Sequence, residues 1–272
     1  MRKDAPIGVF DSGVGGLTVA REIIRQIPNE RIVYFGDTAR LPYGTKSKDT
    51  IIRYARQIVN FLMNEGVKAI VVACNTASAY ALEEIKDEIE VPIIGVVKPG
   101  ARTAVSVTKN NRIGIIATEG TINSGLYTRL IHEENPDIEV IGKACPLLVS
   151  LVEEGWLHDS ITDQVLERYL ESLKKEDIDT LVLGCTHYPL LRSSIGRIMG
   201  GSVNLVNPAY ETAVELKRLL AERELANVKD VEEPSVMYRF YVSDAAEKFK
   251  NIADMILPFD IKTTKQINID EY

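Results

Sequence analysis

The sequence predicts an α/β protein made of two similar, open and mainly parallel sheets flanked by helices, with the active site in the cleft between them. Short apolar runs alternate with helical patterns along all 272 residues, which is typical of parallel α/β folds. Three of these runs recur in the same order, two after 106 residues and one after 111, which indicates a duplication. The third run ends in each copy at a cysteine, Cys74 and Cys185.

The expected strands are short and rich in Val, Ile and Leu, as parallel strands buried on both faces are. In chain order they are Ile7–Phe10, Ile32–Phe35, Ala69–Ala73, Pro92–Val96, Arg112–Ala117, Glu139–Gly142, Thr180–Gly184, Val203–Val206 and Val236–Val242. The helical patterns between them are Leu17–Gln26, Lys48–Glu65, Ala79–Glu88, Ile161–Lys174 and Glu211–Arg223.

Two proline-containing stretches, Val97–Gly100 and Asn207–Ala209, are interpreted as crossovers between the halves. The first domain would then be discontinuous, with residues 1–97 and 208–272, and the second would span residues 98–207. Open parallel sheets bind ligands beyond the carboxyl ends of their strands. Both cysteines lie at such ends, so a duplicated fold would place them across a pseudo-two-fold cleft.

Composition limits the class of protein. The 45% hydrophobic fraction is ordinary for a globular chain, and the net charge of −7 argues against general nucleic-acid binding. No apolar run approaches the roughly 18 residues that span a membrane. The beginning, Met1–Pro6, shows no signal-peptide pattern, and three widely separated cysteines do not suggest disulfides. We therefore expect a cytoplasmic location.

The two cysteines have matched surroundings. Each follows a buried strand and precedes Asn, Thr or Ser residues that can cap a helix. A thiol at a helix start meets the positive end of the helix dipole, which favours the thiolate. Taken singly, either cysteine is more often an inert core residue. As a pair, Cys74 and Cys185 indicate two bases facing one substrate, whereas Cys145 is interpreted as structural.

A glycine-rich turn, Asp11–Gly16, follows the first strand. Its backbone N–H groups can bind an anion, or it can be a plain strand-to-helix turn with a capping aspartate. A dinucleotide site is disfavoured, because Thr18 replaces the third glycine of the fingerprint and Asp11 would repel a pyrophosphate.

Other candidate residues have an ordinary alternative. His187, two residues after Cys185, can exchange protons near neutral pH, or it can be a loop histidine with a local hydrogen bond. Zinc is disfavoured, because no C-x2-C pair is present. Glu153 stands beside another acid, as solvated surface residues often do, and Tyr43 in a Pro-Tyr-Gly turn is more often a packing residue.

Several segments together resemble the bacterial glutamate racemases of the aspartate/glutamate racemase family. They are Asp11-Ser12-Gly13, Gly36-Asp37 with Leu41-Pro42-Tyr43-Gly44, Cys74-Asn75-Thr76, Pro146–Gly155, Gly184-Cys185-Thr186-His187-Tyr188-Pro189-Leu190 and Val242-Ser243-Asp244. The resemblance extends from about residue 5 to residue 258 in the expected order, and only the last dozen residues are unmatched.

This resemblance implies an isomerase that interconverts L- and D-glutamate without a cofactor or metal and supplies D-glutamate for peptidoglycan. Position by position, it implies Cys74 and Cys185 as the acid/base thiols, tuned by Asp11 and His187, with Glu153 supporting His187. The substrate-binding residues that it implies are Asp11, Ser12, Tyr43, Gly44, Asn75, Thr76, Thr186 and His187. We also expect a homodimer that binds neither nucleic acid nor membrane.

The chemistry of inversion at Cα requires such a pair of acid/base groups independently of the resemblance. Inversion at Cα requires one group to remove a proton from one face and another to return a proton to the opposite face. One cysteine must then be a thiolate while the other is a thiol, although an ordinary thiol has a pKa of ~8.5. Without an electron sink, electrostatic preorganisation must lower the barrier by on the order of 10 kcal/mol or more.

Two alternatives remain open at this point. A sister enzyme would act on aspartate, a hydantoin or a maleate-type substrate. Aspartate is one methylene group shorter than glutamate, and a pocket discriminates such a difference by only about 1–3 kcal/mol. A non-catalytic module that binds an amino acid would have the same architecture but no need for two thiols across the cleft.

Overall fold

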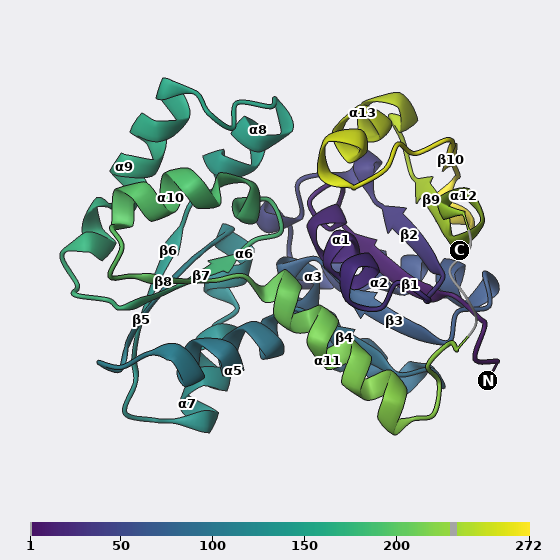
Figure 1. Ribbon diagram of the computed structural model, residues 1–272, viewed down its shortest axis with the longest axis horizontal. Helices are drawn as coiled ribbons and strands as arrows, with labels where there is room; N and C mark the ends of the chain where they lie inside the picture. Colours follow the sequence, from purple (N-terminus) through teal and green to yellow (C-terminus); the bar gives the residue numbers. More distant parts are fainter. Residues whose placement is uncertain (1, 229–232) are drawn as a thin grey trace.

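The structure, a computed structural model that describes residues 2–228 and 233–272, contains two parallel sheets side by side (Figure 1). The first has the strand order β10-β9-β2-β1-β3-β4 and the second has the order β6-β5-β7-β8. The strands of the first sheet are β1 (Ile7–Asp11), β2 (Ile32–Gly36), β3 (Ala69–Val72), β4 (Ile93–Gly95), β9 (Tyr238–Val242) and β10 (Thr264–Gln266). Those of the second are β5 (Arg112–Ala117), β6 (Glu139–Ala144), β7 (Thr180–Gly184) and β8 (Asn204–Val206).

The two sheets repeat one four-stranded pattern. The order β2-β1-β3-β4 in the first corresponds to β6-β5-β7-β8 in the second, strand for strand along the chain. Every pairing in both sheets is parallel. The predicted fold class, two similar parallel sheets flanked by helices, is therefore confirmed. Because β3 and β7 occupy the same place in the two copies, the residues after them lie at equivalent carboxyl ends.

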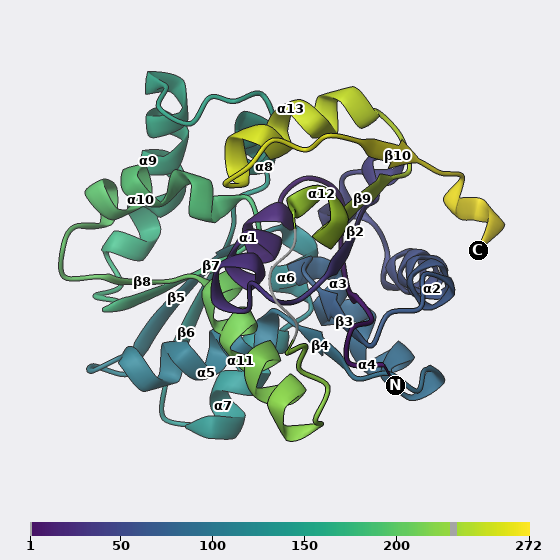
Figure 2. The same ribbon diagram turned by 45° about the vertical axis from the view of Figure 1, so that its right-hand side comes forward.

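Helices cover both faces of each sheet. Those against the first sheet are α1 (Leu17–Gln26), α11 (Pro208–Glu222) and α13 (Ala246–Ile256) on one face, and α2 (Lys48–Asn64), α3 (Asn75–Tyr80) and α4 (Leu82–Ile85) on the other. Figure 2 shows α1 and α2 on opposite sides of β1 to β3. Against the second sheet lie α5 (Val97–Val107) and α7 (Leu126–Glu134) on one face, and α8 (Leu147–Glu153), α9 (Ser160–Lys174) and α10 (Arg192–Met199) on the other. Two short helices, α6 (Glu119–Asn123) and α12 (Pro234–Met237), complete the set in the described ranges.

Local sequence explains why these helices form and what they bury. In α2 the apolar residues Ile51, Ala55, Ile58 and Leu62 recur every three or four positions and are all buried, so one stripe faces the sheet. Ser47 caps this helix by accepting a hydrogen bond from the backbone N–H of Thr50. One apolar cluster extends from α1 and α11 to α5 and α7, so the two sheets share part of their core.

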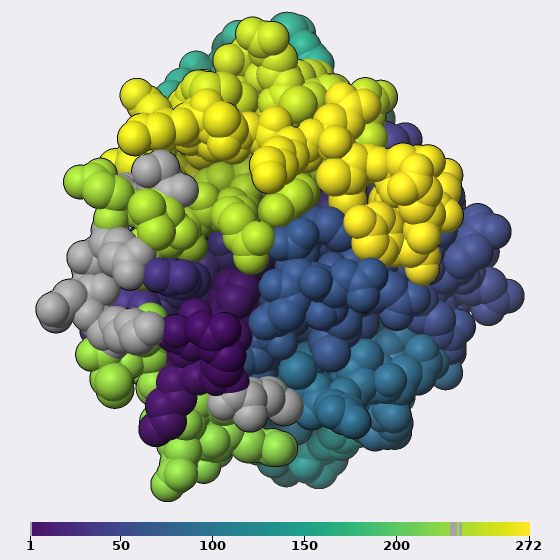
Figure 3. All heavy atoms as spheres, turned by 90° about the vertical axis from the view of Figure 1, so that its right-hand side faces the viewer, coloured from purple at the N-terminus to yellow at the C-terminus, as the bar shows by residue number. Residues whose placement is uncertain are grey.

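The chain passes from the first sheet to the second through α5 and returns through α11. The two proline-containing stretches are thus the first turns of helices, and Asn207 caps α11 by accepting from the N–H of Ala209 at 3.1 Å. After α11, strand β9 pairs with β2. The C-terminal residues, yellow in Figure 3, therefore lie on the same side of the molecule as the first sheet, beside its blue segments from the first hundred residues. The domain boundaries at 97/98 and 207/208 remain a prediction.

Some elements differ from expectation. The single helix expected over Ala79–Glu88 is wrong: α3 begins at Asn75, the chain kinks at Ala81, and α4 gives way to a 3-10 turn. The strand expected from Val236 begins at Tyr238, after the helical turn α12. Strand β10 was missed because Thr264–Gln266 has no apolar run. None of the helices in the described ranges combines the length and hydropathy needed to cross a bilayer.

Candidate active site

The two sheets bring Cys74 and Cys185 to one small cavity. Cys74 follows β3 at the N-cap of α3, and Cys185 follows β7 and leads through a turn to the 3-10 helix Tyr188–Leu191. Each is only 6% exposed. The cavity, of about 30 Å³, is lined by Ser12, Leu41, Pro42, Tyr43, Gly44, Cys74, Asn75, Thr76, Thr118, Val149, Gly184, Cys185, Thr186 and His187.

The first thiol is held in its protonated form. Burial raises the pKa of Cys74 to about 12, and the negative charge of Asp11 adds to this, whereas the backbone N–H of Ala77 and the Ser12 hydroxyl oppose it. Its Sγ donates toward Ser12 Oγ at 3.9 Å. The expectation that the helix start alone would favour a thiolate is therefore wrong for Cys74, because burial beside a carboxyl group outweighs the helix dipole.

The second thiol has a different neighbour. Sγ of Cys185 lies 3.7 Å from Nδ1 of His187, whose Nε2 lies 3.2 Å from Oε1 of Glu153. Burial lowers the pKa of His187, but its hydrogen bonds to Cys185 and Glu153 outweigh burial and raise that pKa to about 10. Burial likewise raises the pKa of Glu153, but the hydrogen bond from His187 and the positive charges of His187 and Lys248 together outweigh it, so the net shift is downward. A protonated imidazole therefore sits between Glu153 and Cys185, and its Nδ1–H and positive charge face the sulfur of Cys185.

The glycine-rich turn holds its own carboxyl group and reaches the second cysteine loop. Asp11 accepts from the N–H of Gly13 at 3.0 Å and from the hydroxyl of Thr186 at 3.4 Å. Burial raises the pKa of Asp11, and the charge of His187 opposes this. A Cβ on Gly15 would lie 2.3 Å from Thr186 Oγ1 and 2.5 Å from His187 Nδ1. Glycine is required here because the turn lies directly against the other loop.

Tyr43 is anchored from behind the cavity. Its hydroxyl donates to Asp37, which also accepts from Arg40 Nε at 2.7 Å and from Ser243 Oγ at 2.8 Å. A Cβ on Gly44 would lie 2.6 Å from Cβ of Thr118. The Tyr43–Gly44 turn therefore closes one end of the cavity against the second sheet.

Several residues at or behind the cavity were missed by sequence reasoning. Thr118 Oγ1 lies 2.9 Å from Thr76 Oγ1, and Thr121 Oγ1 lies 3.2 Å from the same atom. The repeat offered a signal for Thr118, because it stands 106 residues after Ser12, at the equivalent strand end. Val149 on α8 and Tyr127 on α7 carried no such signal.

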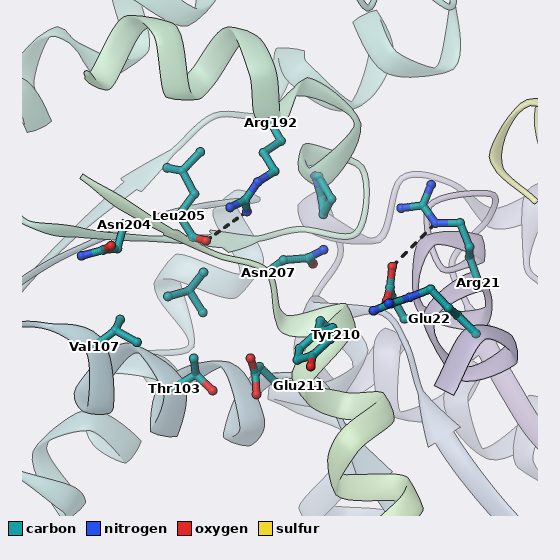
Figure 4. A pocket seen from close by; sticks show the side chains of 13 residues that line it. Arg21, Glu22, Thr103, Val107, Arg192, Asn204, Leu205, Asn207, Tyr210 and Glu211 are labelled. Carbon is teal, nitrogen blue, oxygen red and sulfur yellow. Dashed lines mark hydrogen bonds and ion pairs between the residues drawn. The ribbon is translucent and has the colours of Figure 1, made fainter. Parts of the chain in front are cut away.

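The volume of a cavity does not identify the candidate active site in this molecule. A larger hollow, of about 570 Å³, lies between α1, α5, β8 and α11 and shares no lining residue with the thiol cavity (Figure 4). Arg21, Arg192 and Glu211 line it, and it contains no cysteine or histidine. Within the described residues, no group of three or more His, Cys, Asp or Glu side chains is arranged to hold a metal ion. The chemical groups for proton transfer therefore converge at the smaller cavity.

Comparison with known proteins decides the family. The sequence pattern of the Asp/Glu/hydantoin racemase family matches residues 7–216. The chain belongs to this family. It is therefore an amino-acid racemase, an isomerase. It is 50% identical to a glutamate racemase of Neisseria meningitidis serogroup B over 268 residues, which cover 98% of this chain and 97% of that protein.

Solved structures agree with this assignment. A glutamate racemase isoform from Bacillus anthracis superposes with a TM-score of 0.93 at 42% identity, covering 98% of both chains. A glutamate racemase from Francisella tularensis, solved in complex with D-glutamate, gives a TM-score of 0.92 at 41% identity and covers 99% of this chain and 100% of that one. The fold and the family predicted from the sequence are thus confirmed.

Nearly all of the predicted site residues line the cavity. Asp11 and Glu153 are the exceptions, and they stand directly behind it, in contact with Thr186 and His187 respectively. The placement makes each proposed role geometrically possible, while the roles themselves stay predictions.

Proposed function

We propose that this racemase interconverts L- and D-glutamate by a two-thiol mechanism. The observation that carries the proposal is that two cysteines, from equivalent strand ends of two sheets, line one cavity. The substrate is inferred from relatives named glutamate racemases at 50% and 46% identity over nearly their whole length. The complex of the Francisella relative with D-glutamate supports the same substrate.

Proton transfer balances between the two thiols. One cysteine, as thiolate, takes the proton from Cα of glutamate, and the electron pair of the C–H bond stays on the substrate as a carbanion. The other cysteine, as thiol, donates its proton to the opposite face and becomes the thiolate. The family resemblance assigns Cys185, with its His187 and Glu153 partners, to L-glutamate and Cys74 to D-glutamate. The raised pKa of the Cys74 thiol suits it to donate the proton when L-glutamate is the substrate.

The cavity wall suits a dicarboxylate substrate. Hydroxyls of Ser12, Thr76 and Thr186 and the amide of Asn75 line it, and no lysine or arginine is among the lining residues. Neutral donors fixed in a buried site stabilise developing charge without reorganising at the moment of reaction. Together with the positive charge of His187, these donors would hold the carboxylates of the substrate.

Entry of the substrate requires the two sheet units to separate. A cavity of about 30 Å³ holds at most two or three water molecules, far less than a glutamate. Contacts of Asp11 with Thr186 and of Gly44 with Thr118 close it. We propose that these contacts break and reform in each turnover, so that reaction takes place in the water-excluded state.

Circular dichroism of the purified protein with L-glutamate tests the proposal. We expect the signal to decay to that of the racemate without added cofactor, and solvent deuterium to enter Cα in heavy water. Equal turnover of aspartate would assign the chain to a sister activity, and binding without deuterium uptake would make it a binding module. Activity lost on dialysis and restored by zinc or pyridoxal phosphate would exclude the two-thiol mechanism.

The cellular role proposed with this activity is the supply of D-glutamate for peptidoglycan synthesis. We further propose that the enzyme is located in the cytoplasm and acts as a homodimer. Deletion of the gene should then create a requirement for D-glutamate, and sedimentation should give twice the chain mass of 30.3 kDa.

A further inference from the structure

A tyrosine from the second sheet's helical layer reaches the residue next to Cys74. Tyr127, the second residue of α7, is 3% exposed, and its hydroxyl donates to Oδ1 of Asn75 at 2.8 Å. Burial raises the pKa of Tyr127 above its ordinary value of 10.0, and the charge of Cys185 adds to this shift. The hydroxyl therefore keeps its proton at neutral pH and donates it to the amide oxygen of Asn75.

Two glycines leave the space that this ring occupies. A Cβ on Gly184 would lie 3.2 Å from Cε2 of Tyr127, and a Cβ on Gly100 would lie 3.3 Å from its hydroxyl oxygen. Gly184 directly precedes Cys185, and Gly100 is in α5. The ring is thus fixed between the end of β7 and α5, so its hydroxyl has little freedom to move away from Asn75.

The hydrogen bond from Tyr127 determines whether the oxygen or the NH2 group of the Asn75 amide faces the cavity. Asn75 lines the cavity and is 4% exposed. Its oxygen is taken by Tyr127, and across residues 2–228 and 233–272 no protein atom accepts a hydrogen bond from its Nδ2 group. An amide held by its oxygen presents N–H donors on the other side. A carboxylate is the group that such donors match.

We infer that Tyr127 is a positioning residue for the substrate, which holds Asn75 so that its Nδ2–H donates to a substrate carboxylate. The inference rests on the proposed glutamate racemisation. Tyr127 lies on α7, against the second sheet, whereas Asn75 lies on α3, against the first. The donor is therefore aimed correctly only when the two units are together, which links substrate binding to closure.

The test is the substitution Tyr127→Phe in the full-length enzyme, which keeps the ring and removes the hydroxyl. We expect KM for both L- and D-glutamate to rise by roughly 2–12-fold, the equivalent of one neutral hydrogen bond, with kcat changed less than about twofold. Tyr241→Phe is the matched control. Its hydroxyl donates to Glu65 at 3.3 Å and lines no part of the cavity, so its KM should equal that of the wild type.

Two further variants separate positioning from general damage. In an Asn75→Ala background, Tyr127→Phe should add no further increase in KM, since the amide that it positions is gone. Asn75→Asp should raise KM at least as much as Asn75→Ala, because a carboxylate facing a carboxylate repels it. This last comparison does not depend on whether Tyr127→Phe folds.

The outcomes distinguish this inference from the proposed function. Failure of the wild-type enzyme to interconvert glutamate would overturn the function and the inference with it. With an active wild type, three results would overturn the inference alone: an unchanged KM in Tyr127→Phe, an equal loss in the Asn75→Ala background, or near-normal KM in Asn75→Asp.

Discussion

Thr186 of the second sheet unit donates its hydroxyl to Asp11 of the first, at 3.4 Å. This bond joins the loop after Cys185 to the turn that lies against Cys74, so one carboxyl group acts on the surroundings of both thiols. Asp11 raises the pKa of Cys74 from within its own sheet and that of His187 from across the cleft. The same carboxyl group thus favours a protonated thiol at one base and a protonated imidazole at the other.

The two thiols should act on different enantiomers. Serine has a far higher pKa than cysteine, so Cys74→Ser and Cys185→Ser should each lower racemisation by on the order of 10²–10⁴-fold. In heavy water, Cys74→Ser should still exchange the Cα proton of L-glutamate faster than that of D-glutamate, because Cys185 remains on its face. Cys185→Ser should show the reverse preference, as NMR of the Cα proton can measure.

Each of these variants needs a measured substrate affinity as its control. Equal loss of exchange on both enantiomers at normal affinity, or near-normal racemisation by either variant, would show the assignment of faces to be wrong.

Removing the Glu153 charge should move the basic limb of the pH profile. Glu153 stabilises the imidazolium of His187, whose pKa is about 10. In Glu153→Gln that support is lost while burial still lowers the pKa, so the limb of kcat/KM should shift to lower pH by roughly 1–2 units.

Glu154→Gln provides the control for this prediction, because its side chain is exposed and pairs with Lys248 at 3.5 Å. A limb that stays in place in Glu153→Gln, or that moves equally in both variants, would contradict the role of the His187–Glu153 pair.

A methyl group at Gly15 should separate the two loops. Because it would meet Thr186 and His187 within 2.5 Å, Gly15→Ala should displace the His187 imidazole from Cys185, and kcat should fall on the order of 10–100-fold. Gly196→Ala in α10 is the control, since its Cβ meets only Leu205 at 3.5 Å and should leave kcat unchanged. Steady-state kinetics on both variants, with thermal melting to confirm folding, would show whether this contact matters.

Cys145 should prove structural. It is fully buried, its carbonyl accepts from the hydroxyl of Tyr188 at 2.8 Å, and it does not line the cavity. Cys145→Ala should retain the wild-type rate and lose about 1 kcal/mol of stability, which lowers the melting temperature by ~2–4 °C. A loss of turnover comparable to that of the other two cysteine variants would assign a third thiol to the reaction.

The sequence by itself determined most of the strands and the place of the two thiols. Runs such as Arg112–Ala117 and Thr180–Gly184 are apolar after their first residue, and both appear as strands with the predicted bounds. Such runs can be recognised locally because a strand buried on both faces needs apolar residues throughout. The repeat then placed Cys74 and Cys185 at equivalent strand ends, since duplicated segments fold alike.

Only the tertiary structure decided the protonation of these groups and the contacts between distant residues. Burial holds the proton on Cys74, and Glu153 reaches His187 from 34 residues away in the chain. The bond from Tyr127 to Asn75, 52 residues apart, depends on how the helices of the second sheet lie against those of the first. No local pattern specifies such contacts or the desolvation they bring, because both arise from packing between elements and not from the periodicity within one.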